Sequence, residues 1–553
     1  MIQSIYKIVP KRFYRKYIKS KIYPALVFLK RRENNSDAEM DFIKKLNRYK
    51  IQWQSKNKNI ILTQIIEDHA YCIKLAACSN YIAKKESANI ALYDAESRIE
   101  WNPDYNYKRW NYFFTEKFTT RLDKIFLSFA GKVVFRNSNL YNNQTLVKEA
   151  YFKIKNTIST KEDILKIEIE GIVLGDLIYD TYLRFANKPT VNIEDPYLDK
   201  IIIESINIFY NCKKTLEIYT VKALVSSYAS YIKHGIIVRV CLSKNIPVYT
   251  IGAYYSLVHK AIKEYPSHSN SHFLFHKHFQ SIENKDEIIS EYKEVFEKRF
   301  KGEIDAATSY MKQSAFSAHK SPELENIDWP NTIVLLSHCF FDSPHIYRSL
   351  IFPDFYEWIT FTLDTLLNKK KLTILVKQHP NGLPENDEIF AHLKEKYKNT
   401  NIKFINKKTS NIEFFESKPK AIITAYGTAA AEFAYQGFPV LTIYDNPFTA
   451  FDFTYLAKTI EQYKEFLEKI ETLLPKQKKD EIIEYYYMQH FFYLKGKSAD
   501  YLAFNKYRGQ TYSDDFLIDY LPKMDVHYFE VIDSAIKEGF ELIDWENTNL
   551  LAK

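Results

Sequence analysis

The feature that most constrains the fold of this chain is an alternation of short apolar runs with helical stretches, which starts near residue 59. Apolar runs at 59–64 and 89–94 have the composition of buried strands, and the stretch 68–85 between them has helical periodicity. A strand, a helix and a second strand in succession form a βαβ unit, which places both strands in parallel in one sheet. The pattern returns around the runs 223–226 and 247–251, so we expect a first parallel sheet covered by helices.

A second series of the same kind begins at Thr332, after a polar stretch at 315–328 that lacks periodicity. Its expected strands are 332–336, 372–376, 402–405, 421–424 and 440–443. We therefore expect an α/β protein with two Rossmann-like domains. The expected organisation is an N-terminal segment 1–50, a first Rossmann-like domain 51–325, a second one 326–475 and a C-terminal helical extension 476–553.

The positive charge of the chain is concentrated at its N-terminus. The formal net charge is +9, and residues 1–32 hold ten Lys and Arg side chains and no acid. The rest of the chain carries one more acidic than basic residue, so its body is close to neutral. A nucleic-acid-binding protein needs a basic face on its folded body, so the sequence argues against nucleic acid as a partner.

Residues 1–32 interleave these cations with aromatic and aliphatic side chains. The apolar runs are too short to span a bilayer, and the segment lacks the features of a signal peptide. This composition suits attachment to an anionic membrane surface, whereas a basic helix packed on the body or a disordered arm is the alternative. The five cysteines are scattered, which favours a reduced compartment. We therefore expect a cytoplasmic protein held peripherally at the inner face of the cytoplasmic membrane.

The strongest candidate site lies in the stretch 376–382, Val-Lys-Gln-His-Pro-Asn-Gly. It directly follows an expected strand, so it belongs to the carboxyl edge of the second sheet, where ligands bind in open α/β folds. His379 can donate a hydrogen bond to a phosphate oxygen, and Pro380 fixes the turn that presents it. Lys377 adds a cation for a leaving nucleotide phosphate. The alternative is an ordinary turn with a solvated histidine.

A second candidate site begins where the expected strand 421–424 ends. Thr424 and Thr428 offer hydroxyl groups, and Gly427 lets a ligand approach the backbone closely. A helix that begins at Thr428 would present free N–H groups to a phosphate, and Glu432, one turn later, can hold ribose hydroxyls. The alternative is a capped helix whose small side chains pack on the sheet.

Three more polar side chains follow the expected strand at 332–336, namely His338, Asp342 and His345. The two histidines are seven residues apart and could ligate a metal, but such histidines more often bind phosphate or pack in the core. No DxD motif stands convincingly at the end of an expected strand. We therefore expect neither a metal nor another cofactor.

Taken together, these motifs resemble those of a known family. The His-Pro pair at 379–380, the cluster from His338 to His345 with the stretch 352–358, and the first-domain stretch 171–184 resemble bacterial GT-B glycosyltransferases of capsule and lipopolysaccharide assembly. The resemblance is to enzymes with an HP motif that transfer CMP-activated acidic sugars, such as Kdo or sialic acid.

This resemblance implies the GT-B architecture, in which two Rossmann-like domains face a cleft. It implies that the chain binds a nucleotide sugar, CMP-linked in the similar enzymes, and a glycan or lipid-linked acceptor. His379 and Thr428 would then contact the donor phosphate. The transfer would be inverting and independent of metal, because His, Lys and a helix N-terminus can neutralise the leaving phosphate.

An inverting transfer needs a base that takes the proton of the acceptor hydroxyl. Asp176 and Asp180 are four residues apart and share a face if their segment is helical, and two neighbouring carboxylates can raise the pKa of one of them. Asp68 and His69 follow the first expected strand and would face the cleft. The alternative for each is a helix cap or a surface side chain, so the base stays open among these four residues.

Other functions fit the same architecture. A UDP- or GDP-sugar transferase or a CDP-glycerol phosphotransferase would use another nucleotide, and a nucleotide-sugar 2-epimerase would need no acceptor and no membrane. A scaffold of polysaccharide export would keep the fold without catalysis. The basic N-terminus argues against the epimerase, and the complete set of His379, Thr428 and Glu432 argues against the scaffold.

Overall fold

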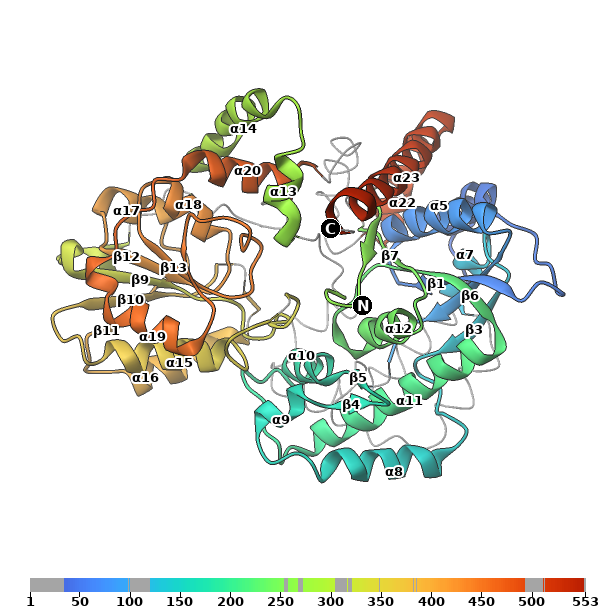
Figure 1. Ribbon diagram of the computed structural model, residues 1–553, viewed down its shortest axis with the longest axis horizontal. Helices are drawn as coiled ribbons and strands as arrows, with labels where there is room; N and C mark the ends of the chain where they lie inside the picture. Colours follow the sequence, from blue (N-terminus) through green and yellow to red (C-terminus); the bar gives the residue numbers. More distant parts are fainter. Residues whose placement is uncertain are drawn as a thin grey trace. The chain divides into compact units, whose positions relative to one another are not determined.

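The computed structural model describes residues 34–551 except for 98, 100–119, 253–256, 267–271, 304–315, 317–320, 348, 381, 384, 493–510 and 512. The basic segment 1–32 lies outside the described residues, so its attachment to a membrane stays a prediction. The chain forms two compact units (Figure 1). The first draws its described residues from Met1–Ala186, Asn192–His268 and Lys495–Trp545, and the second from Asn187–Val191, Ser269–Leu494 and Glu546–Lys553.

The first unit is built on a six-stranded sheet with the order β3-β2-β1-β6-β7-β8. Its strands are β1 (Asn59–Ile65), β2 (Asn89–Asp94), β3 (Lys132–Arg136), β6 (Thr220–Ser226), β7 (Val248–Thr250) and β8 (His259–Ala261). All neighbours are parallel except β8, which runs antiparallel to β7. β1 and β2 are buried along almost their whole length, as expected for strands with helices on both faces.

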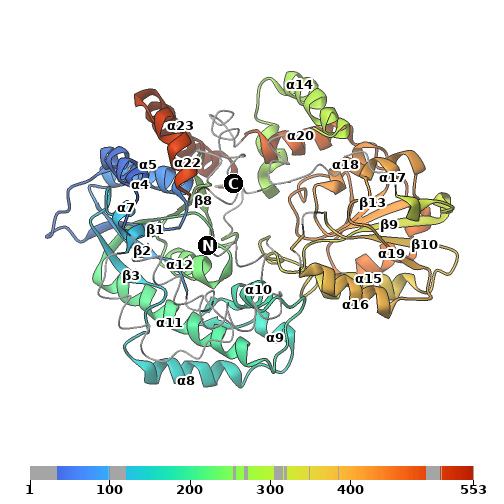
Figure 2. The ribbon, with the colours of Figure 1, turned by 180° about the vertical axis from the view of Figure 1, so that it is seen from behind.

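Helices cover both faces of this sheet, as Figure 2 shows from behind. One face carries α4 (Asp37–Leu46), the 3₁₀ turn η2 (Asn47–Tyr49), α5 (His69–Lys85) and α7 (Arg121–Phe126). The other carries α10 (Gly175–Ala186), α11 (Pro196–Ile218) and α12 (Tyr231–Ser243). Outside them lie α8 (Gln144–Lys155), α9 (Lys161–Leu165) and a small hairpin of β4 (Glu168–Ile169) and β5 (Ile172–Val173).

The last helices of the chain complete the first unit. They are α22 (Asp514–Tyr520), the 3₁₀ turn η10 (Leu521–Lys523) and α23 (Val526–Glu546). Phe516 and Ile536 of these helices are buried in one apolar cluster with Ile61 of β1 and Ile90 of β2. The expected extension 476–553 is therefore not a separate module.

The second unit is built on a six-stranded parallel sheet with the order β11-β10-β9-β12-β13-β14. Its strands are β9 (Thr332–Leu336), β10 (Thr373–Lys377), β11 (Ile402–Ile405), β12 (Ala421–Thr424), β13 (Val440–Ile443) and β14 (Tyr455–Ala457). The first five coincide closely with the expected strands.

Helices again cover both faces (Figure 1). α15 (Phe355–Leu366), α16 (Asn386–Lys396) and α19 (Ile460–Glu468) pack on one face, where Trp358 donates a 2.9 Å hydrogen bond to the Tyr463 hydroxyl. The other face has α17 (Asn411–Ser417), α18 (Ala429–Tyr435), α14 (Lys285–Lys298) and α20 (Lys479–His490). Short elements complete the unit: η4 (His272–Leu274), α13 (Phe275–Phe279), η5 (Arg299–Lys301), η6 (Pro322–Leu324), η7 (Trp329–Asn331), η8 (Ile470–Thr472) and η11 (Asn547–Leu551).

The α/β class and the two Rossmann-like sheets are thus confirmed, but the division of the chain differs from the expected one. The units meet in the sequence at His268 and Ser269 rather than near 325. The reason is that α13 and α14 pack on α20, within the second unit. α14 ends at Lys298 and is followed by η5, after which Gly302, with φ +88°, adopts the left-handed conformation that ends helices.

Two further sequence expectations bear on localisation. Among the described residues, no helix has both the length and the apolar character needed to cross a bilayer. All five cysteines are buried free thiols.

Candidate functional site

The candidate site lies at the carboxyl edge of the second sheet, where the strand order reverses. β9 lies between β10 and β12, so the chain leaves β9 in one direction and later crosses back to the other side. Doubly wound sheets bind ligands beyond the carboxyl ends of their strands at such a switch point. Ser337 and His338 follow β9, His379 follows β10, and Tyr426 follows β12.

The structure brings together two histidines that the sequence singled out separately. The ring centroids of His338 and His379 are 6.1 Å apart. The His338 ring also packs on Tyr426 at 4.7 Å and on Phe355 at 4.8 Å. The ring of His338 is therefore held by Tyr426, which follows β12, and by Phe355 at the start of α15.

Both histidines are neutral near pH 7. Burial lowers the pKa of His338 to about 4. Burial also lowers the pKa of His379 to about 4, assisted by His338 and Lys377 and opposed by Asp342. A neutral imidazole has one N–H donor and one bare nitrogen, so each ring can donate to a phosphate oxygen without adding a full positive charge.

Two buried polar atoms beside these rings have no partner. Ser337 Oγ and His338 Nδ1 are both buried, and neither makes a hydrogen bond within the part of the chain that the structure describes. Buried polar atoms in native proteins are nearly always paired with protein or water. Their occurrence at the end of β9 marks a place for a polar ligand or for ordered water.

The two remaining members of the β9 cluster differ in exposure. Asp342 is exposed, and its charge acts on the pKa of His379, so its carboxylate lies near that ring. His345 is half-buried in the same loop. Among the described residues, no group of three or more His, Cys, Asp or Glu side chains could hold a metal ion.

The turn after β10 has the expected form. The Gly382 N–H donates to the His379 carbonyl oxygen at 3.1 Å, which closes a turn with Pro380 in its second position. Lys377, however, is buried, and its ammonium donates to Asn411 Oδ1 at 2.6 Å. Burial lowers the pKa of Lys377 to about 7. Lys377 is therefore bound to Asn411 within the second unit, and its role toward a leaving phosphate stays a prediction.

The start of α18 has fewer free N–H groups than expected. The Ala430 N–H donates to the Gly427 carbonyl oxygen at 2.9 Å, and the N–H groups of Ala431 and Glu432 donate to that of Thr428. These three donors are engaged within the turn itself. A phosphate would have to use the hydroxyl of Thr428, which makes no capping hydrogen bond.

The neighbouring glycine is not required by crowding within the protein. A Cβ atom on Gly427 would lie 3.5 Å from Thr424 Oγ1, which is an ordinary contact. Thr424 itself is buried at the end of β12. Any need for glycine at this turn would therefore come from a ligand.

Glu432 has a partner that the sequence did not reveal. Its Oε1 accepts a 2.6 Å hydrogen bond from Arg299, and both side chains are buried. The Arg299 guanidinium lies 5.5 Å from the Phe296 ring centroid and 5.6 Å from that of Tyr486. A buried cation needs a buried counterion, which explains the pairing of Arg299 with Glu432; contact of Glu432 with ribose hydroxyls stays a prediction.

Sequence reasoning missed a pair in this unit that consists of an acid and a histidine. His272 Nε2 lies 3.4 Å from Asp445 Oδ1, and both are buried. Burial acts to raise the pKa of Asp445, but hydrogen bonds from His272, Thr449 and the Asn446 N–H lower it overall. Asp445 follows β13 almost directly, which is a usable signal, whereas nothing in the sequence links it to His272.

Aromatic rings connect this pair to the first one. The His272 ring lies 5.3 Å from Tyr347, whose ring lies 4.8 Å from Tyr426. Tyr426 in turn packs on His338. The two histidine sites thus belong to one aromatic layer at the carboxyl edge.

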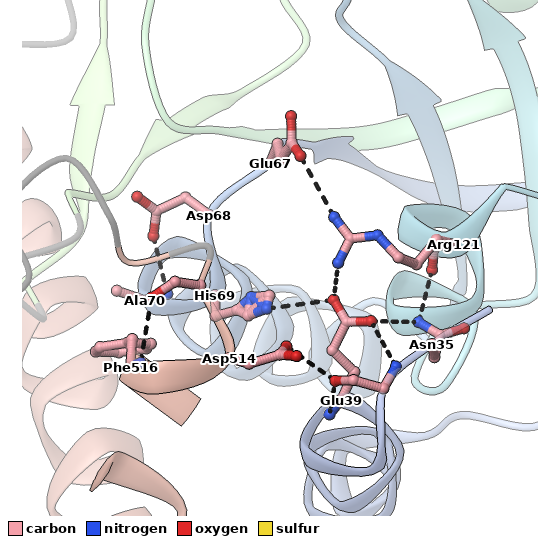
Figure 3. Close-up of polar contacts among 11 residues, drawn as sticks. Asn35, Glu39, Glu67, Asp68, His69, Ala70, Arg121, Asp514 and Phe516 are labelled. Atoms are coloured by element: carbon pink, nitrogen blue, oxygen red, sulfur yellow. Dashed lines mark hydrogen bonds and ion pairs between the residues drawn. The ribbon is translucent and has the colours of Figure 1, made fainter. Parts of the chain in front are cut away.

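In the first unit, Asp68 serves as a helix cap. Its Oδ1 accepts from the Ala70 N–H at 2.9 Å (Figure 3) and from the Tyr71 N–H at 3.2 Å. The Thr511 hydroxyl donates to its other oxygen. Burial raises the pKa of Asp68. This is the alternative that the sequence left open, while the role of Asp68 in catalysis stays a prediction.

His69 lies in the core and not on an open surface as expected. Its ring stacks on Phe42 at 5.2 Å, and its Nε2 is 3.6 Å from Glu39 Oε1 (Figure 3). Glu39 forms a buried ion pair with Arg121. Burial, assisted by the Arg121 charge, lowers the pKa of His69 to about 3. The reason is that α5 is sandwiched between α4 and the sheet.

Asp176 and Asp180 both lie on α10, as predicted, but they are not an isolated carboxylate pair. Asp176 accepts two hydrogen bonds of 2.5 Å from Arg239 of α12, and Asp180 is buried. The attraction of both carboxylates raises the pKa of Arg239, although burial acts to lower it. A guanidinium thus neutralises charge that we expected the two acids to share alone.

No family model matches this chain, and no curated protein matches it. The β-Kdo 2,4 transferase KpsC of Thermosulfurimonas dismutans is similar in structure, with 11% identity over 48% of this chain and 79% of that chain and a TM-score of 0.32. The UDP-GlcNAc 2-epimerase of Methanocaldococcus jannaschii has 12% identity over 76% and 94%, with a TM-score of 0.20. The wall teichoic acid polymerase TagF has 11% identity over 92% and 98%, with a TM-score of 0.19. These TM-scores are too low to support an argument about the fold, which therefore rests on the strands and helices described above.

Proposed function

We propose that the chain is a GT-B-type glycosyltransferase of bacterial surface polysaccharide assembly. It takes a CMP-activated ulosonic sugar, of the Kdo or sialic acid type, and transfers it with inversion and without a metal to a glycan or lipid-linked acceptor. The donor phosphate binds at the carboxyl edge of the second sheet.

One observation carries this proposal. At the switch point of a doubly wound sheet, His338 and His379 lie together beside two buried polar atoms without partners, Ser337 Oγ and His338 Nδ1. Such a position is where this fold binds ligands, and unpaired buried donors and acceptors suit a phosphate better than an apolar group.

The chemistry follows from the states of these groups. The bond between the anomeric carbon and the phosphate oxygen breaks, and the nucleotide leaves with the bonding electrons. The neutral His379 donates its N–H to a phosphate oxygen, with the Thr428 hydroxyl as a second donor. Donors fixed in a buried site stabilise developing charge without reorganising. The acceptor oxygen forms the new bond and gives its proton to a base.

We assign the base to the first unit. Asp176 and Asp180 of α10 are the first pair to test, although Arg239 holds Asp176. Asp68 caps α5 and His69 is in the core, which favours structural roles for both. Residues 1–32 hold the enzyme at the anionic inner face of the cytoplasmic membrane, where a lipid-linked acceptor is available.

Calorimetric titration with CMP, CDP, UDP and GDP tests this function. We expect CMP to bind most tightly, and His379→Ala to weaken that binding. His392→Ala is the matched control, because His392 is exposed on α16 of the same unit. It should bind CMP like the unchanged protein.

Each other result points to a different function. If only UDP or GDP binds, the donor is a UDP- or GDP-sugar instead of a CMP-sugar. Conversion of a UDP-sugar without any acceptor would indicate an epimerase. Transfer of glycerol phosphate from CDP-glycerol also releases CMP, so release of CMP from CDP-glycerol but not from a CMP-sugar would indicate that reaction. If no nucleotide binds, the transferase proposal fails and a scaffold role remains.

A further inference from the structure

The first unit contains a cavity that the proposed function does not use. Its volume is about 460 Å³, and it lies between η2, the last turns of α5 and the middle of α23. Three cations line it, Arg48, Lys84 and Lys85, together with one carboxylate, Asp533. The lining thus has more positive than negative side chains.

The carboxylate already has partners within the lining. Asp533 Oδ1 accepts a 2.9 Å hydrogen bond from the Tyr49 hydroxyl, and its Oδ2 is 3.7 Å from Arg48 Nη2. By contrast, no acidic side chain in the described part of the chain forms an ion pair with Lys84 or Lys85. The positive charge of these two lysines is therefore available to a ligand.

Helix capping explains the two lysines only in part. Cations are favoured near a helix C-terminus, and both lie in the last turn of α5. Two of the last four carbonyl groups, however, already accept backbone hydrogen bonds, because Glu86 N–H donates to Ile82 and Ala88 N–H donates to Ala83. The ammonium groups are not needed as caps, and the dipole does not account for Arg48.

Arg48 is held in a position that suits an oxyanion. Its guanidinium lies 4.2 Å from the Phe529 ring centroid and 5.5 Å from that of Tyr49. Stacking on aromatic rings fixes the plane of the guanidinium and leaves N–H groups at its edge. A guanidinium fixed in this way can donate two parallel hydrogen bonds to a phosphate.

The cavity also has an apolar wall. The Tyr81 ring stacks on Phe540 of α23 at 4.8 Å, and Ile536 and Ala77 line the cavity beside it. Cations next to an apolar wall fit a ligand that joins a phosphate to hydrocarbon. A free inorganic phosphate would use only the cations.

The cavity is close in sequence to the basic segment. η2, which carries Arg48, directly follows α4, and α4 is the first described element after residues 1–32 with their ten cations. A buried ion pair between Glu39 and Arg121 fixes α4 to the body. Among the described elements, α4 alone separates the basic segment from η2 in the sequence.

We propose that this cavity binds the phosphate group of an anionic membrane lipid. Arg48, Lys84 and Lys85 contact the phosphate, and Tyr81 and Ile536 pack against the glycerol and acyl carbons. This site binds neither the nucleotide sugar nor the acceptor glycan. Lipid binding can therefore be tested independently of the transferase activity.

The test measures binding of the full chain to vesicles of phosphatidylcholine with and without phosphatidylglycerol, by co-sedimentation. We expect K84E/K85E to lower the affinity for the anionic vesicles at least about tenfold, because each cation near an anionic surface contributes about fivefold. Both lysines are exposed, so the melting temperature should not change. Hydrogen exchange should show protection of the end of α5 by anionic vesicles in the unchanged protein only.

K370E/K371E is the matched control, since these adjacent lysines are exposed in the second unit and the change in net charge is the same. It should lower the affinity by about twofold at most. Equal losses in both double variants, or no loss in K84E/K85E, would overturn the proposal. If glycerol 3-phosphate protects the end of α5 while anionic vesicles do not, the ligand is a soluble phosphate ester and the lipid assignment is wrong.

Discussion

The two sheets of this protein have the same strand order, apart from the antiparallel edge strand β8 of the first, but their switch points differ in how polar groups are paired. In the first unit, the space beside the end of β1 is filled by Gln64, whose Oε1 accepts from the Ser227 N–H at 2.8 Å and the Ser227 hydroxyl at 2.7 Å. Its Nε2 lies 2.5 Å from His234 Nδ1. In the second unit, Ser337 Oγ and His338 Nδ1 have no such partner among the described residues.

This difference helps to decide whether a polar residue at the end of a strand has a structural or a functional role. Asp68, His69 and Asp176 of the first unit are engaged by caps, packing or a guanidinium, so they stabilise the fold. In the second unit, the rings of His338 and His379 lie 6.1 Å apart, and His338 Nδ1 makes no hydrogen bond among the described residues. A buried polar atom without a hydrogen-bond partner therefore indicates a functional site better than the type of residue does.

The largest expected effect concerns the ion pair in the core of the first unit. Arg121→Ala should lower the free energy of unfolding of this unit by about 3–5 kcal/mol, because it leaves Glu39 buried without its counterion. Denaturant unfolding followed by hydrogen exchange of α5 would measure it. A double variant, Glu39→Met with Arg121→Met, should recover most of the loss. If it does not, the pair has a role beyond charge balance.

The second effect concerns turnover in the second unit. His379→Ala should lower kcat about 10²–10³-fold, because one preorganised donor to the leaving phosphate is lost. The melting temperature should change little, since the ring is only partly buried. Steady-state assays with a CMP-activated sugar and thermal melting would measure both. Near-normal turnover would place the donor site elsewhere, and unfolding would make this histidine structural like those of the first unit.

The third effect is the response of the second unit to acid. The pKa of folded His379 is about 4, against an ordinary 6.5, so the unfolded chain takes up the proton first as the pH falls. This contribution to stability, about 3 kcal/mol, is complete above pH 6.5 and is lost as the pH falls from 6.5 to 4. His379→Gln should flatten the stability of the second unit in that window, whereas His392→Gln should not. Equal pH profiles for the unchanged protein and His379→Gln would show that the ring is solvated.

The smallest effect concerns the cap in the first unit. Asp68→Ala should lower stability by about 1 kcal/mol, and Asp68→Ser should restore it because serine also caps. We expect Asp68→Ser to keep turnover as well. Denaturant unfolding and kinetic assays of both variants would measure this. A loss of turnover in a stable Asp68→Ser variant would make Asp68 the base.

The sequence predicted the fold well where periodicity and strand ends decide it. The strands β1, β2 and β9 to β13 and the helix α5 lie where expected, because apolar runs and helical spacing are local signals. The division into units was less accurate, because α22 and α23 pack on β1 and β2 from far along the chain. Long-range packing of this kind leaves no local pattern.

For the candidate site, the sequence could predict which residues follow strand ends but not which partners they contact. The sequence indicated that His338 and His379 each follow a strand, and the topology of the sheet brings them together. The partners that bind the expected charges were not visible, since Arg299 is far from Glu432 and Arg239 is far from Asp176 in the sequence. Burial of Lys377 likewise depends on Asn411 of α17.

The return of the last helices to the first sheet has a consequence for synthesis on the ribosome. The cluster of the first unit needs Phe516, Ile532 and Ile536, which are translated long after β8 ends at Ala261. At about 5–20 residues per second, the roughly 250 residues in between take tens of seconds. During that time the nascent first unit exposes apolar surface on the face that α22 and α23 later cover, so it is the stage at which chaperone binding would protect this chain most.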